Sequence, residues 1–278
     1  MVGIALVALA EVFAEFSVSV GKYQVAHKRE TLFAMGFLSA LWATLFMAAI
    51  GFLGGSAFYF SLESLPTFLL RAVLEVFLMY ITLHALIAAD RTTFSFLRII
   101  TIPLLLATDL WIGYDVSMTE MTGISVIVVA LVFLLLNHGL SRNGKLLSLA
   151  SAILAVTTIS LYKYDITHYN SVAAEQTLMN LIVLSAMALG GAVYAKENVF
   201  RYLLHPIYLA QSVAAGVASV LMSFGFAFGH PSVIMAAKRS FEIVVSIVSG
   251  RAYFHEKHIL VKSISVSLIA GGIVLMLL

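Results

Sequence analysis

Cysteine is absent from this chain of 278 residues, and charged residues make up only 11% of it, against 62% hydrophobic residues. Without cysteine, disulfides, thiolate metal sites and cysteine nucleophiles are excluded. Soluble domains carry about 25% charged residues, so this chain has too little polar surface to form a water-soluble globule. A net charge of +2 does not indicate a nucleic-acid-binding surface. The composition indicates an integral membrane protein whose first partner is the lipid bilayer.

Apolar runs of about 20 residues, the length that spans a bilayer, recur along the whole chain. They predict ten transmembrane helices, at residues 2–22, 31–54, 66–88, 92–112, 119–136, 146–162, 172–195, 207–228, 231–252 and 259–277. Pro66, Pro206 and Pro231 fall at predicted helix starts, which suits proline. Pro103 lies in the middle of the fourth span, where it should kink the helix. We expect an all-α integral membrane fold in one transmembrane domain.

Lysine and arginine are divided unevenly between the two sides of this ten-helix arrangement. The side opposite the N-terminus carries eleven of them, namely Lys22, Lys28, Arg29, Arg91, Arg142, Lys145, Lys196, Arg201, Arg251, Lys257 and Lys262. The side of the N-terminus carries Lys163 alone. Basic residues in short loops stay in the cytoplasm. We therefore expect a multi-pass protein of the cell (inner) membrane with both termini outside the cytoplasm.

Two stretches of the sequence match at an offset of 141 residues. Residues 19–27 (SVGKYQVAH) align with residues 160–168 (SLYKYDITH), with serine, lysine, tyrosine and histidine in the same places. The same offset superposes two further pairs of charged residues, Arg98 with Arg239 and Asp115 with Glu256. Residues 1–140 and 141–278 are thus predicted to form two five-helix repeats, the second inverted in the membrane. Inverted repeats commonly build transporters that bind their substrate near the midplane.

Charged side chains inside membrane spans are the most informative positions, because each costs about 2.5–3.5 kcal/mol at a helix centre. Eight lie well inside the predicted spans: Glu11, Glu15, Arg71, Glu75, Arg98, Lys238, Arg239 and Glu242. Four acids balance four bases, so a paired cluster facing the interior of the bundle is expected. These eight residues form the predicted binding site for a substrate or protons.

The spacing of these residues suggests individual roles. Glu11 and Glu15 lie one helical turn apart, so mutual repulsion and burial favour proton binding at one of them. Arg71 and Glu75 are also four residues apart and can pair within their helix, although either could contact a substrate instead. A further acidic residue, Asp109, lies nearer the outer end of the fourth span.

The motifs of common membrane or metal-dependent enzymes are missing. The stretch His255-Glu-Lys-His258 looks like a zinc-protease helix, but that chemistry needs the second histidine four residues after the first. A membrane enzyme acting on lipid-linked substrates would gather its catalytic groups at one interface, whereas these charges lie at mid-depth. We therefore expect no enzymatic activity, no catalytic or metal-binding residues and no cofactor.

The C-terminal fifth of the chain carries a family resemblance. It combines a glycine-rich end of the eighth span, Pro231-Ser232 at the start of the ninth, Glu256 just beyond it, and Ala270-Gly271-Gly272 in the tenth. This pattern resembles the drug/metabolite transporter superfamily, specifically its ten-helix EamA-like members, and the resemblance covers the whole chain. It implies a five-plus-five inverted repeat whose cavity is lined mainly by helices one, three, four, six, eight and nine.

A second resemblance concerns the first helix. Ala10-Glu11-Val12 looks like the first helix of the small multidrug resistance relatives, whose single membrane glutamate exchanges protons for cations. A lysine follows that glutamate closely, whereas Lys22 lies seven residues after Glu15 and eleven after Glu11, so either could correspond. Ten-helix members usually keep both termini in the cytoplasm, opposite to the orientation that the loop charges predict.

The sequence predicts a secondary transporter, proton-coupled or facilitative, for a small polar metabolite such as an amino acid or a derivative. Glu11 and Glu15 would bind protons or the substrate amine, while Arg98, Lys238 and Arg239 would attract a carboxylate or phosphate. Arg98 and Arg239 could instead only maintain the repeat symmetry. The alternatives are a proton-coupled exporter of cationic drugs, a membrane enzyme for lipid-linked substrates and a structural subunit. The protein could be a monomer or a homodimer.

Overall fold

A computed structural model describes residues 1–278 except 54–57, 90–93, 96, 139–142, 255–258 and 278. The described residues form helices and no strand, which confirms the predicted all-α class. The α-helices are α1 (Val2–Ala26), α2 (Leu32–Leu53), α3 (Leu65–Ala88), α5 (Thr101–Ile112), α6 (Met118–His138), α7 (Lys145–His168), α8 (Val172–Gly190), α9 (Pro206–Ala227), α10 (Pro231–Phe254) and α11 (Ile259–Leu277). The shorter helices are η1 (Leu62–Ser64), η2 (Arg98–Ile100), η3 (Gly191–Ala195) and η4 (Val199–Leu204).

Within the described residues, six helical segments are long and apolar enough to cross a membrane. They are Val2–Ala26, Leu32–Leu53, Leu62–Ala88, Lys145–His168, Val172–Ala195 and Pro206–Ala227. Their apolar surfaces stay exposed on the outside of the bundle, as lipid-facing helices require. The chain is therefore a multi-pass membrane protein. Four residues used in the sequence analysis, Arg91, Arg142, Glu256 and Lys257, lie outside the described residues, as does the histidine motif at 255–258.

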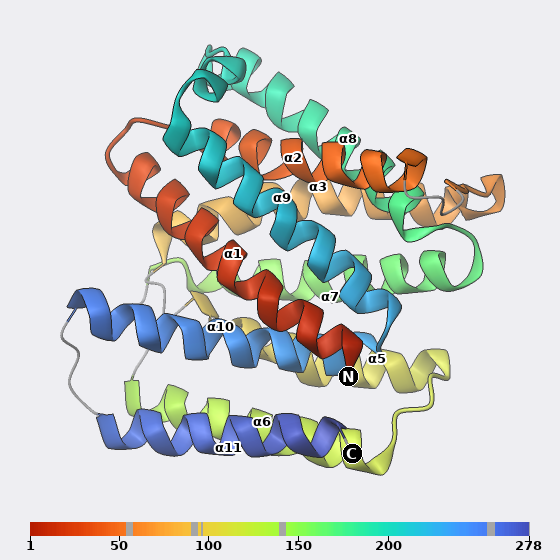
Figure 1. The fold of residues 1–278 in the computed structure, drawn as a ribbon, viewed down its shortest axis with the longest axis vertical. Coiled ribbons are helices and arrows are strands. Elements are labelled where there is room, and N and C mark those ends of the chain that lie inside the picture. Colours follow the sequence, from red (N-terminus) through yellow and green to blue (C-terminus); the bar gives the residue numbers. More distant parts are fainter. Residues whose placement is uncertain (54–57, 90–93, 96, 139–142, 255–258, 278) are drawn as a thin grey trace.

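The helices pack in a pattern that joins distant parts of the sequence. In Figure 1, α1 lies along α9 and α2 crosses between α8 and α9, while α3 packs against α7. α6 and α11 form a pair at one edge of the bundle, next to α10. This pair is close because Gly123 of α6 faces Gly272 of α11, and a Cβ on Gly123 would lie 2.6 Å from the carbonyl oxygen of Gly272. Small residues of this kind allow close approach of membrane helices.

The fourth predicted span is interrupted rather than continuous. The 3-10 turn η2, at Arg98–Ile100, comes directly before α5. Pro103 has no N–H to donate to the carbonyl of Ile99 four residues earlier, and its ring crowds that carbonyl. The irregularity expected at Pro103 is therefore present as a tighter turn just before it, and α5 is only 12 residues long.

The sixth predicted span is longer than the sequence suggested. α7 continues to His168 instead of ending at residue 162. Lys163 and Asp165, which were expected in an outer loop, are therefore on the last turns of a helix, and Asp165 is fully buried. The predicted span ended too early because an apolar run ends at the first charged residues. The helix and its packing continue past them.

The two matching stretches of sequence adopt the same local structure at the ends of α1 and α7. Nδ1 of His27 lies 2.8 Å from the carbonyl oxygen of Tyr23, and Nδ1 of His168 lies 2.9 Å from that of Tyr164. In both helices the tyrosine and histidine rings are in contact, with centroids 4.1 Å and 4.4 Å apart. The repeated residues thus make the same contacts within their own helices.

The repeated lysines also make matching hydrogen bonds to backbone carbonyls. Nζ of Lys22 donates to the carbonyl oxygen of Ala89 at the end of α3, at 3.1 Å. Nζ of Lys163 donates to the carbonyl oxygen of Phe226 near the end of α9, at 2.9 Å. Each lysine satisfies a carbonyl in the last turn of a neighbouring helix, where helical hydrogen bonds end.

Asp109 links α5 to α10. Its side chain is fully buried, and its Oδ2 accepts a hydrogen bond of 2.8 Å from the backbone N–H of Ser232, in the first turn of α10. A carboxylate in this place satisfies an N–H that has no partner within the helix and interacts favourably with the positive end of the helix dipole.

We predict that Asp109→Ala lowers the free energy of unfolding by about 1–3 kcal/mol, because the buried N–H of Ser232 loses its acceptor. Asp109→Asn, which keeps an oxygen acceptor, should lose less. Thermal unfolding in detergent measures both, with Asp115→Ala in the exposed loop as a control. Equal losses in the alanine and asparagine variants would show that Asp109 does not act through this hydrogen bond.

Candidate functional site

A cavity of about 390 Å³ lies between the helices. Helices α1, α2, α3, α7, α8, α9 and α10 and the turn η2 all contribute to its wall. Most of its lining is small or apolar, but polar side chains project from several sides: Ser17, Arg71, Glu75, Arg98, Tyr162, Gln176, Asn180 and Lys238. A cavity of this size and mixed lining is typical of a site for a small molecule.

A smaller cavity of about 130 Å³ adjoins it. Its charged lining residues are Glu11, Glu15, Arg98, Lys238, Arg239 and Glu242. Arg98 and Lys238 line both cavities. The structure therefore brings all eight predicted site residues to one of two adjoining cavities, although they come from α1, α3, η2 and α10.

Two ion pairs occupy the smaller cavity. Lys238 of α10 pairs with Glu11 of α1, and Arg239 pairs with Glu242 one turn further along α10. Glu242 also accepts a hydrogen bond of 2.6 Å from the hydroxyl of Ser95. The pair of Lys238 and Glu11 joins α10 to α1 at mid-span, where an unpaired charge would be most costly.

The pair between Glu11 and Lys238 changes the picture expected for the first helix. The positive charge of Lys238 offsets the repulsion between Glu11 and Glu15. The expectation that one of the two glutamates binds a proton depended on that repulsion. Glu15 is half-buried and lies 3.5 Å from the hydroxyl of Ser19, one turn along the same helix. The two glutamates therefore differ: Glu11 is buried and paired across helices, and Glu15 is more accessible.

Arg98 is the most available cation of the site. Its guanidinium lies over the ring of Phe94, at 5.1 Å from the centroid. Within the part of the chain that the structure describes, that guanidinium makes no hydrogen bond or ion pair. Glu75, which lines the same cavity, likewise has no hydrogen-bonded partner among the described residues. A cation and an anion that have no hydrogen-bonded partner among the described residues thus line one cavity.

The expected pair of Arg71 and Glu75 within α3 is wrong. Nη1 of Arg71 instead lies 2.6 Å from Oε1 of Glu175, in the first turns of α8, and both side chains are almost completely buried. Helical side chains lean toward the N-terminus of their helix. The side chain of Arg71 therefore points toward the N-terminal end of α3, where α8 also begins. Glu75 lies one turn in the opposite direction.

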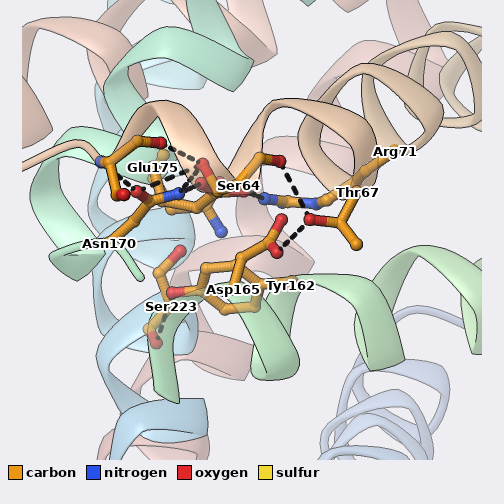
Figure 2. Close-up of polar contacts among 10 residues, drawn as sticks. Ser64, Thr67, Arg71, Tyr162, Asp165, Asn170, Glu175 and Ser223 are labelled. Carbon is orange, nitrogen blue, oxygen red and sulfur yellow. Dashed lines mark hydrogen bonds and ion pairs between the residues drawn. The ribbon is translucent and has the colours of Figure 1, made fainter. Parts of the chain in front are cut away.

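Figure 2 shows the polar network around this pair, where α3, α7 and α8 meet. Asn170 donates to Oε2 of Glu175 at 2.6 Å and to the hydroxyl of Ser64 at 2.9 Å. The ring of Tyr162 lies 4.6 Å from the Arg71 guanidinium carbon, and the Tyr162 hydroxyl donates to the carbonyl of Ser223. Two members of the network, Arg71 and Tyr162, also line the larger cavity.

The sequence analysis missed both acids of this network, Asp165 and Glu175. Asp165 was placed in a loop. Glu175 lies inside the predicted span 172–195 but was not counted among the charges within the spans. A signal was present, since Glu175 is the only charged residue between 172 and 195. A lone acid in an otherwise uncharged span requires a partner.

A second buried polar contact lies at the opposite end of the molecule, between α1 and α2. Glu30 is buried, and its Oε1 accepts a hydrogen bond of 3.2 Å from Gln211 of α9. Burial is the main cause that raises the pKa of Glu30 from 4.5 to about 8; the Gln211 hydrogen bond opposes this rise and the nearby Glu197 adds to it. Glu197 also accepts a hydrogen bond from Thr31, which connects this loop to the segment after η3.

The fold and these cavities define a multi-pass helical membrane protein with a charged interior. No protein-family model and no curated protein matches the sequence. A solved structure described only as "Crystal structure of protein" is similar over 99% of this chain and 95% of its own, with a TM-score of 0.70 and 14% sequence identity. That likeness shows a shared fold. Among the described residues, no group of three or more histidine, aspartate or glutamate side chains could hold a metal ion.

The pair of Lys238 and Glu11 leads to a prediction about stability. Lys238→Gln leaves the buried Glu11 without its partner and should cost about 3–5 kcal/mol, and Glu11→Gln, which leaves the half-buried Lys238, should cost less. The double variant removes both charges, so it should be more stable than either single variant. Unfolding of the four proteins in detergent gives the coupling energy. Additive losses would mean that the two side chains do not interact.

Glu30 leads to a prediction about pH. Because its pKa is about 8 in the folded protein and near 4.5 when unfolded, the folded state binds an extra proton between these values. Stability should therefore fall as the pH rises from about 4.5 to about 8, and Glu30→Gln should reduce this fall. Thermal unfolding across this range measures it, with the exposed Glu63→Gln as a control. An unchanged slope in Glu30→Gln would contradict the assignment.

Proposed function

We propose that the protein is a secondary transporter for a small polar metabolite that carries both signs of charge, such as an amino acid or a derivative. The observation that carries this proposal is the larger cavity, which is lined by both Arg98 and Glu75, neither of them hydrogen-bonded to a side chain among the described residues. Arg98 and Lys238 would attract a carboxylate or phosphate, and Glu75 would bind an amine. Transport would proceed by alternating access, either proton-coupled or facilitative.

The helix packing supports a five-plus-five inverted repeat, with residues 1–140 and 141–278 as its halves. In such a repeat α1 corresponds to α7 and α3 to α9, so the contact of α1 with α9 should match that of α7 with α3. Both contacts are extensive in the structure. The matching histidine and lysine contacts at the ends of α1 and α7 agree with it. This arrangement is the one that membership of the drug/metabolite transporter superfamily would require.

The orientation in the membrane is part of the proposal. The N-terminus and the end of α11 lie on the same side of the bundle in Figure 1, as an even number of spans requires. The uneven distribution of lysine and arginine supports an orientation with that side outside the cytoplasm. The loop of Glu30 would then face the cytoplasm, and the network of Arg71 and Glu175 would lie near the outer surface of the cell (inner) membrane.

A proton-coupled exporter of cationic drugs is the second candidate. It is favoured by Glu15, which is partly accessible and lines the smaller cavity. In that case Glu15 would alternate between a proton and the cation, and Arg98 would contribute nothing to binding.

The two candidates predict different ligands and different sensitive residues. We predict that amino acids raise the thermal stability of the purified protein, by about 2.7 kcal/mol at 100 times the dissociation constant. The effect should be lost in Arg98→Gln and Glu75→Gln, since each removes one half of the proposed site. Arg201→Gln, at a side chain that is 61% exposed, is the matched control.

A panel of amino acids, quaternary amines and organic anions separates the possibilities. Stabilisation by cations alone, abolished in Glu15→Gln and kept in Arg98→Gln, would support the drug exporter and overturn the first proposal. A response to no member of the panel would count against a transporter of small polar metabolites.

A further inference from the structure

The network where α3, α7 and α8 meet contains one cation and two carboxylates. Arg71, Asp165 and Glu175 are each no more than 4% exposed. The other groups facing Asp165 and Glu175 are neutral, apart from the exposed His168 on the same helix as Asp165: Ser64 and Thr67 of the α3 region, Tyr162 of α7 and Asn170 before α8. If both acids were ionised, this buried network would keep an uncompensated negative charge, which is costly in an apolar interior.

The hydrogen bonds of Glu175 identify it as the ionised acid. Its Oε1 accepts from the guanidinium of Arg71, and its Oε2 accepts from the amide of Asn170. Both oxygens act as acceptors from donors that cannot themselves accept, so there is no place for a proton between them. Arg71 and Glu175 therefore form a neutral pair, and Asp165 carries the remaining charge or a proton.

The contacts of the Thr67 hydroxyl bear on whether Asp165 is ionised or protonated. Its oxygen lies 2.9 Å from the carbonyl oxygen of Ser64 and 2.5 Å from Oδ1 of Asp165. Figure 2 shows the hydroxyl between these two oxygens. A threonine hydroxyl has one proton, and a carbonyl oxygen can only accept. If Thr67 donates its proton to Ser64, the shorter contact needs a proton from Asp165.

The second oxygen of Asp165 agrees with this assignment. Oδ2 is buried and has no hydrogen-bond partner among the described residues. A bare carboxylate oxygen in this place would lack any donor, which is unfavourable, whereas the carbonyl oxygen of a neutral acid is far less costly to leave unpaired.

We infer that Asp165 is a proton-binding site of the membrane region: a neutral carboxylic acid at neutral pH that donates its proton from Oδ1 to the hydroxyl of Thr67. The proton joins α7 to α3 beside Arg71, which lines the larger cavity. Loss of the proton would place a second carboxylate next to Glu175 and remove the donor of the shorter contact. This site is separate from Glu11 and Glu15, and it holds whether or not the protein is a transporter.

Infrared spectroscopy of the protein reconstituted in lipid bilayers tests the inference directly. A protonated carboxylic acid has a carbonyl stretching band that a carboxylate lacks. We expect this band in the difference spectrum of the wild type and Asp165→Asn at neutral pH. Bands from other buried acids, such as Glu30, cancel in this difference. Asp115→Asn, the same substitution at an exposed position, should leave the spectrum in this region unchanged.

A second variant tests the donor without removing the acid. Thr67→Val keeps the shape of the side chain but removes the acceptor, so the Asp165 band should persist and shift to higher frequency. This variant also covers the case in which Asp165→Asn does not fold. A difference spectrum without the band would mean that Asp165 is ionised, and an Asp165 band that is unshifted in Thr67→Val would mean that Asp165 does not donate to Thr67; either result would overturn the inference.

The ionic medium distinguishes a proton from a bound cation. The Asp165 band should be the same in sodium and in choline buffers of equal pH. A band that appears only after sodium is replaced by choline would show that a sodium ion occupies the site in place of the proton, and it would also overturn the inference.

Discussion

The need to compensate charges inside an apolar bundle shapes this molecule more than any other constraint. A charged side chain that faces neither water nor a partner costs several kcal/mol, so each one determines what must lie beside it. Lys238 joins α10 to α1 through Glu11, and Arg71 joins α3 to α8 through Glu175. These helices are neighbours around the larger cavity. The ion pairs thus hold together the walls of the space that they also make polar.

The helices themselves could be predicted from the sequence, whereas the partners of the charges could not. Hydropathy located the helices because each span must satisfy its own backbone and expose apolar side chains to lipid. Their ends were less certain, as α7 shows, because a helix continues past a charged residue when packing covers it. The offset match of residues 19–27 and 160–168 identified two stretches that make the same contacts.

Arg71 shows why the partner of a charge is hard to predict. The sequence offers Glu75 one turn away, and Glu175 is 104 residues distant. The acid that the guanidinium reaches is determined by the direction in which the arginine side chain leans and by the helix that packs there. A spacing of four residues in the sequence reveals neither. Glu30 presents the same difficulty in another form. Beside Lys28 and Arg29 it looks like part of an exposed loop, but Gln211 of α9 covers it.

The balance of buried charges differs between two parts of the wall of the larger cavity, the network of Arg71 and the surroundings of Arg98. Where α3, α7 and α8 meet, the acids Asp165 and Glu175 outnumber the single cation, and a proton can restore neutrality without a ligand. Arg98 cannot be balanced in this way, since a guanidinium keeps its charge under physiological conditions. The nearby acids Glu11, Glu75 and Glu242 offset its charge from a distance, and an anion that enters the cavity can pair with it directly. Among the described residues Arg98 has no hydrogen-bonded or ion-paired partner, so an anionic group that enters the cavity gains a direct contact, and this asymmetry makes Arg98 the centre of the proposed binding site.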